Sequence, residues 1–456
     1  MAGCASAPPA PAPQPGTLRY AYVVLAEAGQ PVARAITSAA ACPSIELDGG
    51  ARPMTVRAAP AVVPARAAPA GFGPAKAAAF PVLACELRIP AGVTRATVEG
   101  RVLPLPKANP QRIVVLGDTG CRLAAAGAVY QRCNDAVAWP FAAVADAAAA
   151  AAPDLVIHVG DFHYRESPCP PGDDGCRDSP WGYGWDAWEA DLFAPAQKLL
   201  AAAPWIVVRG NHESCARAGQ GWYRFVDPQP AAPRRACDDP ADDAIGDYSE
   251  PYAVPFGTTA AADTQFIVFD SSLAGLSPLT PAQPMYGIYR AQMERAFALA
   301  AARPHAFFLL HHPVLGFASN PRSPSTPYPG NAALQSVLKG LHPAVLFPAG
   351  VDAVLAGHNH LFEAVGFVTP HPPHYIVGNG GSSLDSPFPV PFPAAVAPAP
   401  GAVVDNIAAR HDFGFATMER DAGGWRVVDR DTRGTPQLNC RVADRRSKCA
   451  AAGAAP

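Results

Sequence analysis

Five short polar segments, each placed directly after a short apolar run, constrain this chain more than any other feature. The apolar runs, 112–116, 154–159, 205–208, 307–310 and 353–356, are typical of buried strands that end in turns. Because ligand sites of open α/β sheets lie at the carboxyl ends of strands, we expect the five segments to meet at one edge. In chain order they are Gly117-Asp118-Thr119-Gly120, Gly160-Asp161-Phe162-His163-Tyr164, Gly210-Asn211-His212-Glu213, His311-His312-Pro313 and Gly357-His358-Asn359-His360.

The side chains in these segments are of the types that bind catalytic metals. Carboxylate, imidazole, amide and phenolate donors together suit divalent and trivalent first-row metals. Thiolates, which mark structural zinc sites, are absent from all five segments. The glycines fit strand-to-loop turns that need a positive φ or a close approach of the backbone. The pattern therefore predicts a catalytic metal pair rather than a metal that only supports the fold.

The order of the segments resembles the calcineurin-like metallophosphoesterases and, within them, the purple acid phosphatases. Their blocks are GDxG, GDxxY, GNH(D/E), an apolar run ending in His, and GHxH, and all five match between about residues 111 and 430. Tyr164 is the most specific match, because most of the wider superfamily lacks a tyrosine three residues after the bridging aspartate. The resemblance implies an α/β fold, the calcineurin-like αββα sandwich of two packed mixed β-sheets flanked by helices.

The resemblance also implies a role for each matched residue. His212 would hydrogen-bond the substrate phosphate or protonate the leaving alkoxide. In the family the first metal is Fe(III) and the second Fe, Zn or Mn, and a phenolate favours a trivalent ion. His312 falls where the family varies, and the family's histidine beyond the fourth block has no clear counterpart here. The implied ligands are Asp118, Asp161, Tyr164 and His360 for the first metal and Asp161, Asn211, His311 and His358 for the second, with Asp161 as the bridge.

The expected activity is that of a metal-dependent phosphoric ester hydrolase, similar to an acid phosphatase. Two cations about 3.5–4 Å apart clamp a phosphate and lower the pKa of a bound water, so we expect hydrolysis of phosphate monoesters by a metal-bound hydroxide. One alternative is a phosphodiesterase or nucleotidase of the same superfamily, which would differ in its rates on monoesters and diesters. Another is a metal-bearing cell-surface binding protein without turnover, which would predict a broken ligand set, whereas every ligand position is filled. The physiological ester and the oligomeric state stay open.

Composition and charge narrow the choice of partner. A net charge of −3 over 456 residues and a pI near 6.4 provide no basic footprint for nucleic acid, so the expected partner is a small phosphorylated substrate. The chain is long enough for a large core and more than one domain. An alanine-rich run at 143–152 is typical of a helix and is too interrupted to span a bilayer.

Cysteine usage favours an oxidising compartment. None of the eleven cysteines occupies a proposed ligand position. An even set away from the metals indicates disulfides, and hence an extracytoplasmic protein that is periplasmic, secreted or a cell-envelope lipoprotein. The connectivity stays open, and buried free thiols are the alternative. Ten cysteines are close in sequence two by two: Cys42 and Cys85, Cys121 and Cys133, Cys169 and Cys176, Cys215 and Cys237, Cys440 and Cys449.

The eleventh cysteine, Cys4, lies in Ala2-Gly3-Cys4-Ala5-Ser6, followed by Ala/Pro-rich sequence. This segment resembles the end of a bacterial lipoprotein signal peptide, in which Cys4 would carry a lipid anchor to a membrane surface. The charged and apolar parts of such a signal would then lie upstream of Met1. A disordered leader without that role is the alternative.

Composition shifts along the chain predict four parts. Residues 1–16 are an Ala/Pro-rich leader, 17–106 a small N-terminal β-sandwich-like domain with short alternating runs, 107–430 the catalytic domain, and 431–456 a C-terminal tail closed by its own two cysteines. An insertion at 165–186 follows Tyr164 directly, so it is expected to form a rim over the site. Its aromatic residues either face substrate or pack the loop onto the domain: Trp181, Tyr183, Trp185 and, just beyond it, Trp188.

Overall fold

A large mixed sheet runs through the whole molecule. The computed structural model describes residues 16–66, 74–258, 262–394, 396–421 and 423–454, and Cys4 lies outside them, so the lipoprotein interpretation stays a prediction. Within the described residues this first sheet has eleven strands. In spatial order they are β26 (Arg446–Ala451), β25 (Pro436–Ala443), β24 (Gly424–Asp431), β23 (Gly414–Asp421), β11 (Arg112–Leu116), β14 (Leu155–His158), β15 (Trp205–Val207), β1 (Leu18–Leu25), β2 (Pro31–Thr37), β8 (Leu83–Arg88) and β5 (Thr55–Ala58).

A second mixed sheet packs against the first. Ile113 and Ile157 from the first sheet share one buried core with Phe307 and Leu355 from the second. The predicted α/β sandwich of two packed mixed sheets is therefore confirmed. In spatial order the seven strands of the second sheet, counted over the described residues, are β16 (Tyr252–Pro255), β17 (Thr264–Val268), β18 (His305–Leu309), β19 (Val351–Ala356), β21 (His374–Val377), β20 (Phe362–Phe367) and β22 (Val404–Arg410).

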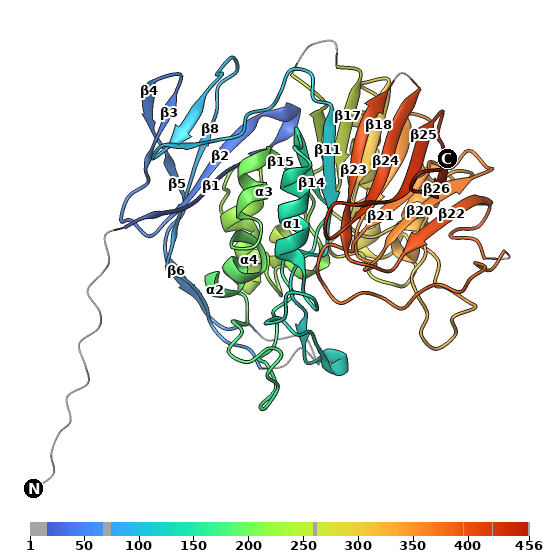
Figure 1. The fold of residues 1–456 in the computed structure, drawn as a ribbon, viewed down its shortest axis with the longest axis horizontal. Helices are drawn as coiled ribbons and strands as arrows, with labels where there is room; N and C mark the ends of the chain where they lie inside the picture. The colour runs from blue at the N-terminus through green and yellow to red at the C-terminus, as the bar shows by residue number, and fades with distance from the viewer. Residues whose placement is uncertain (1–15, 67–73, 259–261, 395, 422, 455–456) are drawn as a thin grey trace, which may run out of the picture.

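Helices cover the outer faces of both sheets. Val144 of α1 and Leu199 of α3 pack with Val156 on the outer face of the first sheet, where Figure 1 shows α1 and α3 in front of the central strands. On the second sheet, Met293 of α6 packs with Phe308 and with residues of α7. The helices are α1 (Phe141–Ala150), α2 (Trp185–Trp188), α3 (Gln197–Ala202), α4 (Gly219–Gly221), α5 (Asp243–Gly246), α6 (Pro284–Ala300) and α7 (Ala332–Leu341).

Local sequence explains these helices. The run of alanines that predicts a helix forms α1, as alanine has the best helix propensity. Pro284 is the first residue of α6, a position that needs no amide hydrogen. Asn331 caps α7 by accepting from the amide of Leu334 at 2.9 Å.

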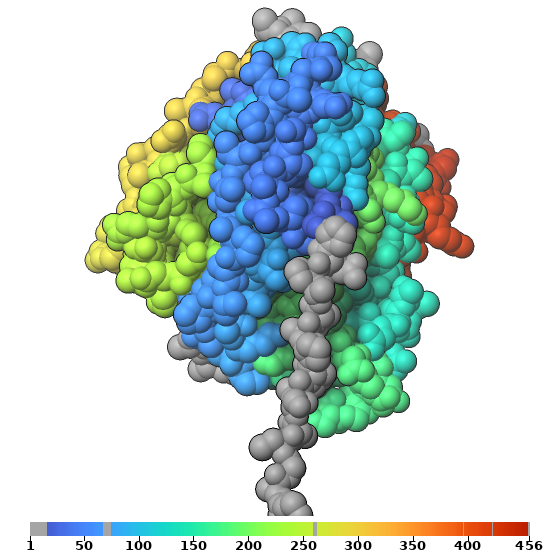
Figure 2. Space-filling model, turned by 90° about the vertical axis from the view of Figure 1, so that its left-hand side faces the viewer, coloured from blue at the N-terminus to red at the C-terminus, as the bar shows by residue number. Residues whose placement is uncertain are grey.

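The N-terminal region is rich in strands, as predicted, but it is continuous with the catalytic sheet. Val24 of β1 pairs in parallel with Trp205 of β15, so β1, β2, β8 and β5 extend the first sheet at one end. A small sheet of β10 (Arg101–Val102), β9 (Ala96–Val98), β3 (Ser44–Leu47) and β4 (Gly50–Pro53) packs on that extension through Ile45 and Val98, which gives the region its sandwich-like character. Figure 2 shows these N-terminal residues, in blue, across the middle of one face of the molecule, between yellow-green residues on one side and green residues on the other.

The residues expected to form a C-terminal tail instead continue the first sheet at its other end. Strands β25 and β26 form a hairpin in which Cys440 lies opposite Cys449. Strands from both sides of the suggested boundaries at residues 106 and 430 thus belong to one sheet. The division into domains stays a prediction. Figure 1 shows the N-terminal and C-terminal strands at opposite sides of the molecule.

All ten cysteines that are close in sequence two by two form disulfides in that pairing. The bridges are Cys42–Cys85, Cys121–Cys133, Cys169–Cys176, Cys215–Cys237 and Cys440–Cys449. Five disulfides are typical of proteins from oxidising compartments. Over the described residues, every helix is too short or too polar to cross a bilayer.

The strand directions bring the polar segments together. Strands β11, β14 and β15 are parallel, and so are β17, β18, β19 and β21. Their carboxyl ends therefore lie at one edge of the sandwich, where ligand sites of such folds occur.

Candidate metal centre

Unusual backbone geometry presents the candidate ligands. Asp118, Asp161 and His358 have φ of 55°, 56° and 71°, in the left-handed region that side chains other than glycine seldom adopt. Gly210 allows the turns to approach closely, because a Cβ there would lie 2.1 Å from Asp161 Oδ1. Gly160, at φ 103°, likewise has no room for a Cβ, which would meet His311 Nδ1 at 2.5 Å. Strain of this kind persists only where surrounding contacts enforce it, and it concentrates at functional sites.

Glu213 joins two of the turns. Its buried carboxylate accepts the backbone amides of Asp161 at 3.0 Å, Phe162 at 2.8 Å, His163 at 3.2 Å and Gly210 at 3.0 Å. The sequence places an acidic residue at the end of the third block, but its role in aligning the second and third blocks depends on the fold.

The hydroxyl of Tyr164 is the centre of the first group of donors. It lies 2.9 Å from Asp118 Oδ1, 2.8 Å from Asp161 Oδ2 and 2.7 Å from His360 Nε2. All four side chains are almost completely buried. Burial, followed by the Asp118 and Asp161 carboxylates, raises the pKa of Tyr164 well above its usual value of 10. A nearby cation is what would favour the phenolate in such surroundings.

A second group of donors surrounds the amide oxygen of Asn211. Asn211 Oδ1 lies 3.1 Å from His311 Nε2 and 3.0 Å from His358 Nδ1. His311 Nε2 is also 3.2 Å from Asp161 Oδ2. Asp161, His311 and His358 offer atoms that all lie within 4.8 Å of one another, close enough to bind one ion.

Asp161 belongs to both groups through a single atom. Its Oδ2 is in contact with the Tyr164 hydroxyl on one side and with His311 Nε2 on the other. A further link comes from the backbone amide of His358, which donates to Asp118 Oδ2 at 3.0 Å. The two groups are therefore adjacent, with one carboxylate between them.

The donor chemistry of these groups fits metal ions. His311 Nδ1 faces the carbonyl of Val159 at 2.9 Å, and because a carbonyl only accepts, Nδ1 carries a proton. In neutral His311 the lone pair of Nε2 then points at the oxygens of Asp161 and Asn211, which also accept. Such a set needs a cation between its atoms or a proton on the ring. Although burial opposes protonation, Asp161 raises the pKa of His311 to about 9.

The same argument applies to His360. Its Nδ1 donates to the carbonyl of Ser383 at 2.6 Å, which directs the other nitrogen at Tyr164 and at Asp118 Oδ1, 3.4 Å away. Outer contacts of this type orient imidazole ligands around metals.

His212 lies beside the two groups and contacts a buried ion pair. Its Nε2 is 3.8 Å from Asp161 Oδ2 and its ring is 3.9 Å from that of Tyr164. Arg217 Nη2 lies 2.6 Å from His212 Nδ1 and 2.8 Å from its Nε2, and Arg217 binds Glu166 with two contacts of 2.5 and 2.8 Å. Burial and the Arg217 cation lower the pKa of His212 from 6.5 to about 4. The sequence motifs did not indicate Glu166 or Arg217, since neither lies in the five segments.

Asp191 is a further residue that the motifs did not indicate. It is fully buried and accepts the backbone amides of Cys121 at 2.9 Å and Tyr164 at 2.8 Å, as well as Arg165 Nε at 2.6 Å. It thereby ties the turns of the first two segments together from behind.

Two other histidines in the motifs are buried and contact groups beside the centre. His163 is fully buried and lies 2.9 Å from the carbonyl of Gly182, so it is not solvent-facing. His312 is buried, 3.3 Å from the hydroxyl of Ser271, and its ring is 4.2 Å from that of His358.

The aromatic residues after Tyr164 pack mainly onto the domain. Trp185 and Trp188 are buried in the core beneath the first sheet, against Phe193 and Phe225. Tyr183 is half-buried, and its hydroxyl is 3.4 Å from Glu166. The sequence left open whether these aromatic residues face substrate or pack the loop onto the domain. For Trp185 and Trp188, the structure shows packing onto the domain.

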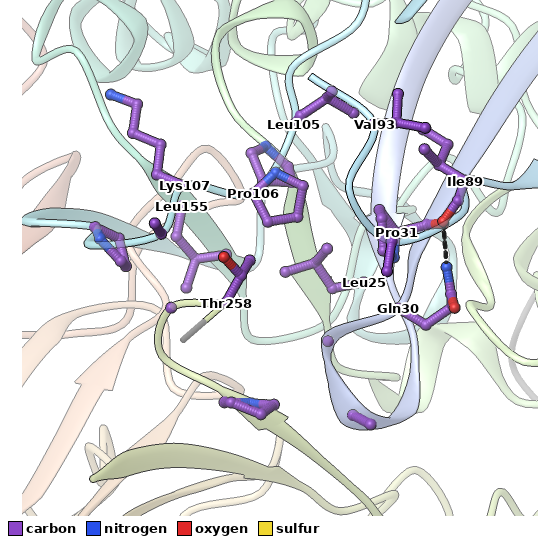
Figure 3. Close-up of a pocket in the computed structure, with 18 of the residues that line it drawn as sticks. Leu25, Gln30, Pro31, Ile89, Val93, Leu105, Pro106, Lys107, Leu155 and Thr258 are labelled. Atoms are coloured by element: carbon purple, nitrogen blue, oxygen red, sulfur yellow. Dashed lines mark hydrogen bonds between the residues drawn. The ribbon is translucent and has the colours of Figure 1, made fainter. Parts of the chain in front are cut away.

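A large cleft lies at the opposite end of the sandwich. It has a volume of about 1250 Å³ and is lined by N-terminal residues such as Leu25 and Ile89 and by Leu155 (Figure 3). Leu155 is the first residue of β14 and Pro204 precedes β15, so this cleft is at the amino ends of β14 and β15. None of the candidate ligands lines it.

Comparison with known proteins agrees with this geometry. The family model of the calcineurin-like phosphoesterases matches residues 111–362, so the chain belongs to this family. This membership supports a metal-dependent phosphoester hydrolase that acts on a phosphorylated substrate. A comparison with curated proteins found no match.

Two solved structures share the fold over nearly the whole chain. A purple acid phosphatase isolated from yellow lupin (Lupinus luteus) seeds superposes with a TM-score of 0.55 at 15% identity, over 96% of this chain and 74% of that one. PhoD superposes with a TM-score of 0.52 at 11% identity, over 95% of this chain and 92% of that one. At these identities the likeness concerns the fold.

Proposed function

We propose that the chain is a dinuclear metal phosphoesterase that hydrolyses phosphate monoesters, as an acid phosphatase does. The observation that carries the proposal is the position of Asp161 Oδ2 between two complete groups of donors. The proposed ligands are Asp118, Asp161, Tyr164 and His360 for the first metal and Asp161, Asn211, His311 and His358 for the second.

The donors favour different ions at the two positions. Tyr164 adds a phenolate to two carboxylates, which suits Fe(III) at the first position, whereas amide and imidazole donors suit divalent Fe, Zn or Mn at the second. When bound, two such ions clamp a phosphate and lower the pKa of a coordinated water.

His212 is the proposed catalytic residue. Arg217 Nη2 lies 2.6 Å from His212 Nδ1 and 2.8 Å from its Nε2, so these contacts hold the imidazole ring in place and either nitrogen can carry its proton. Nε2 is the nitrogen on the side of Asp161. In the tautomer that carries its proton on Nε2, His212 would donate a hydrogen bond to a phosphate oxygen or to the departing alkoxide.

We also infer an extracytoplasmic location, periplasmic, secreted or bound to the cell envelope. The five disulfides support it, because cytosolic thiols are kept reduced.

The proposed function is tested with purified protein by metal analysis and a substrate panel. We expect two metals per chain and faster hydrolysis of p-nitrophenyl phosphate than of bis-p-nitrophenyl phosphate or cyclic nucleotides. Asp118→Asn should lower metal content and turnover, whereas Asp174→Asn, whose side chain is 77% exposed beside Arg177, should change neither. Faster turnover of the diesters would instead favour the phosphodiesterase alternative. Metal-loaded protein that hydrolyses none of these esters would refute the proposal.

A further inference from the structure

Arg122, Arg165 and Arg217 lie near the candidate metal centre, and among the described residues Arg122 lacks a counter-ion. Arg165 is paired with Asp191 and Arg217 with Glu166, at 2.6 and 2.5 Å. In the part of the chain that the structure describes, the guanidinium of Arg122 has neither an ion pair nor a hydrogen bond, and its Nε is buried. A partly buried cation without a partner is costly, which suggests that an anion binds there.

The guanidinium of Arg122 lies near the first group of donors. Its Cζ is 5.9 Å from the centre of the Tyr164 ring, whose hydroxyl contacts Asp118, Asp161 and His360. The cation is thus on the side of the proposed first metal.

The loop that carries Arg122 is held in place. The Cys121–Cys133 disulfide closes it, and the amide of Leu123 donates to the carbonyl of Tyr164 at 3.0 Å. The amide of Arg122 itself donates to the side chain of Gln131 at 2.9 Å. Because these contacts already hold the backbone, binding of a ligand by the guanidinium would not have to order the loop.

We propose that Arg122 binds a terminal oxygen of the substrate phosphate and thereby selects dianionic monoesters over monoanionic diesters. A monoester has three terminal oxygens, of which two metals can engage two, and the guanidinium can engage the third. In a diester that third oxygen carries the second ester group and no charge. The inference rests on the proposed phosphoesterase function and adds a basis for its substrate class.

The test compares Arg122→Met and Arg122→Lys with Arg132→Ala. Arg132 lies in the same disulfide-closed loop but has 66% of its side chain exposed, so its replacement controls for the loss of charge. In Arg122→Met we expect kcat/KM for p-nitrophenyl phosphate to fall roughly 10- to 100-fold, and that for bis-p-nitrophenyl phosphate by less than about threefold. Binding of inorganic phosphate, measured by calorimetry, should weaken by about the same 10- to 100-fold factor. Metal content should stay at the wild-type level.

Arg122→Lys keeps the charge and most of the volume, so it provides the same comparison if the methionine variant does not fold. We expect it to retain part of the monoester preference, because lysine binds phosphate as a point charge without the planar fork. Equal losses on both esters, or unchanged phosphate binding, would overturn the role of Arg122 while leaving the phosphoesterase proposal intact. A wild-type protein that is loaded with metal but hydrolyses neither ester would refute both.

Discussion

Replacement of Glu166 by glutamine is the sharpest test of how the catalytic histidine is positioned. Glu166 is 1% exposed and accepts from Arg217 Nε at 2.5 Å and from its Nη2 at 2.8 Å. The same Nη2 donates to His212. Glutamine has nearly the same shape, but it carries no charge and presents an amide NH₂ where one of the two accepting oxygens was.

The structure sets the size of the effect. Arg217 would be left in a buried place without its counter-ion, and breaking a buried pair in this way costs about 3–5 kcal/mol of stability. Because Arg217 also orients His212, the ring would lose its alignment. A displacement on the order of 1 Å at a reacting group costs about 100-fold in rate. We therefore expect kcat to fall by roughly 10- to 100-fold while both metals stay bound.

Urea unfolding and steady-state kinetics measure the two effects. The matched control is Glu294→Gln, which removes the partner of Arg290 from an exposed ion pair on α6. It should lower the free energy of unfolding by less than about 1 kcal/mol. Burial opposes ionisation of Glu166, but Arg217 and then His212 hold its pKa well below the usual 4.5. Because the pKa of Glu166 is lower in the folded than in the unfolded chain, its ionised carboxylate stabilises the fold above pH 4.5. The difference in free energy of unfolding between wild type and Glu166→Gln should therefore shrink as the pH falls below 4.5. If Glu166→Gln lowers the free energy of unfolding no more than Glu294→Gln does, and turnover stays normal, this reasoning is contradicted.

Three further predictions concern the metals and the disulfides. Asp161→Asn should remove both metals and lower turnover by about 10³-fold, more than Asp118→Asn does; metal analysis that still finds two ions with normal activity would show that the bridge is misassigned. Tyr164→Phe should abolish the visible charge-transfer band of iron-loaded protein and keep its circular dichroism spectrum; a band that persists would exclude the phenolate as a ligand. Intact mass after alkylation of denatured, unreduced protein should find the ten bridged cysteines unmodified, and labelling of most of them would remove the support for an oxidising compartment.

Several elements follow from local sequence alone. The apolar run 112–116 is the strand Arg112–Leu116, and the run 205–208 contains the strand Trp205–Val207. The alanine-rich run at 143–152 overlaps the helix Phe141–Ala150. The cysteine count and positions indicated disulfides, but the connectivity came from the structure, which pairs the cysteines that are close in sequence. Periodicity, turn glycines and short loops are local properties, so neighbouring residues suffice to predict them.

Other features depended on long-range contacts. Residues 17–106 have the alternating runs of a small β domain, yet Val24 pairs with Trp205, so part of that region completes the catalytic sheet. Local patterning indicates which face of a strand is buried, but it contains no information about which strand lies beside it. The aromatic residues Trp185 and Trp188 illustrate the same limit, because substrate contact and core packing demand similar side chains.

The sequence by itself determined the chemistry available at the centre: the types of the donors, their order and the turns that present them. Only the tertiary structure decided which groups support that chemistry, because Glu166 meets Arg217 across 51 residues of chain and Arg122 approaches Tyr164 from a separate, disulfide-closed loop. Ligand type is a property of single side chains in short motifs. The pairing of charges, and the absence of a counter-ion for Arg122 among the described residues, arise from distances that exist only once the two sheets have packed.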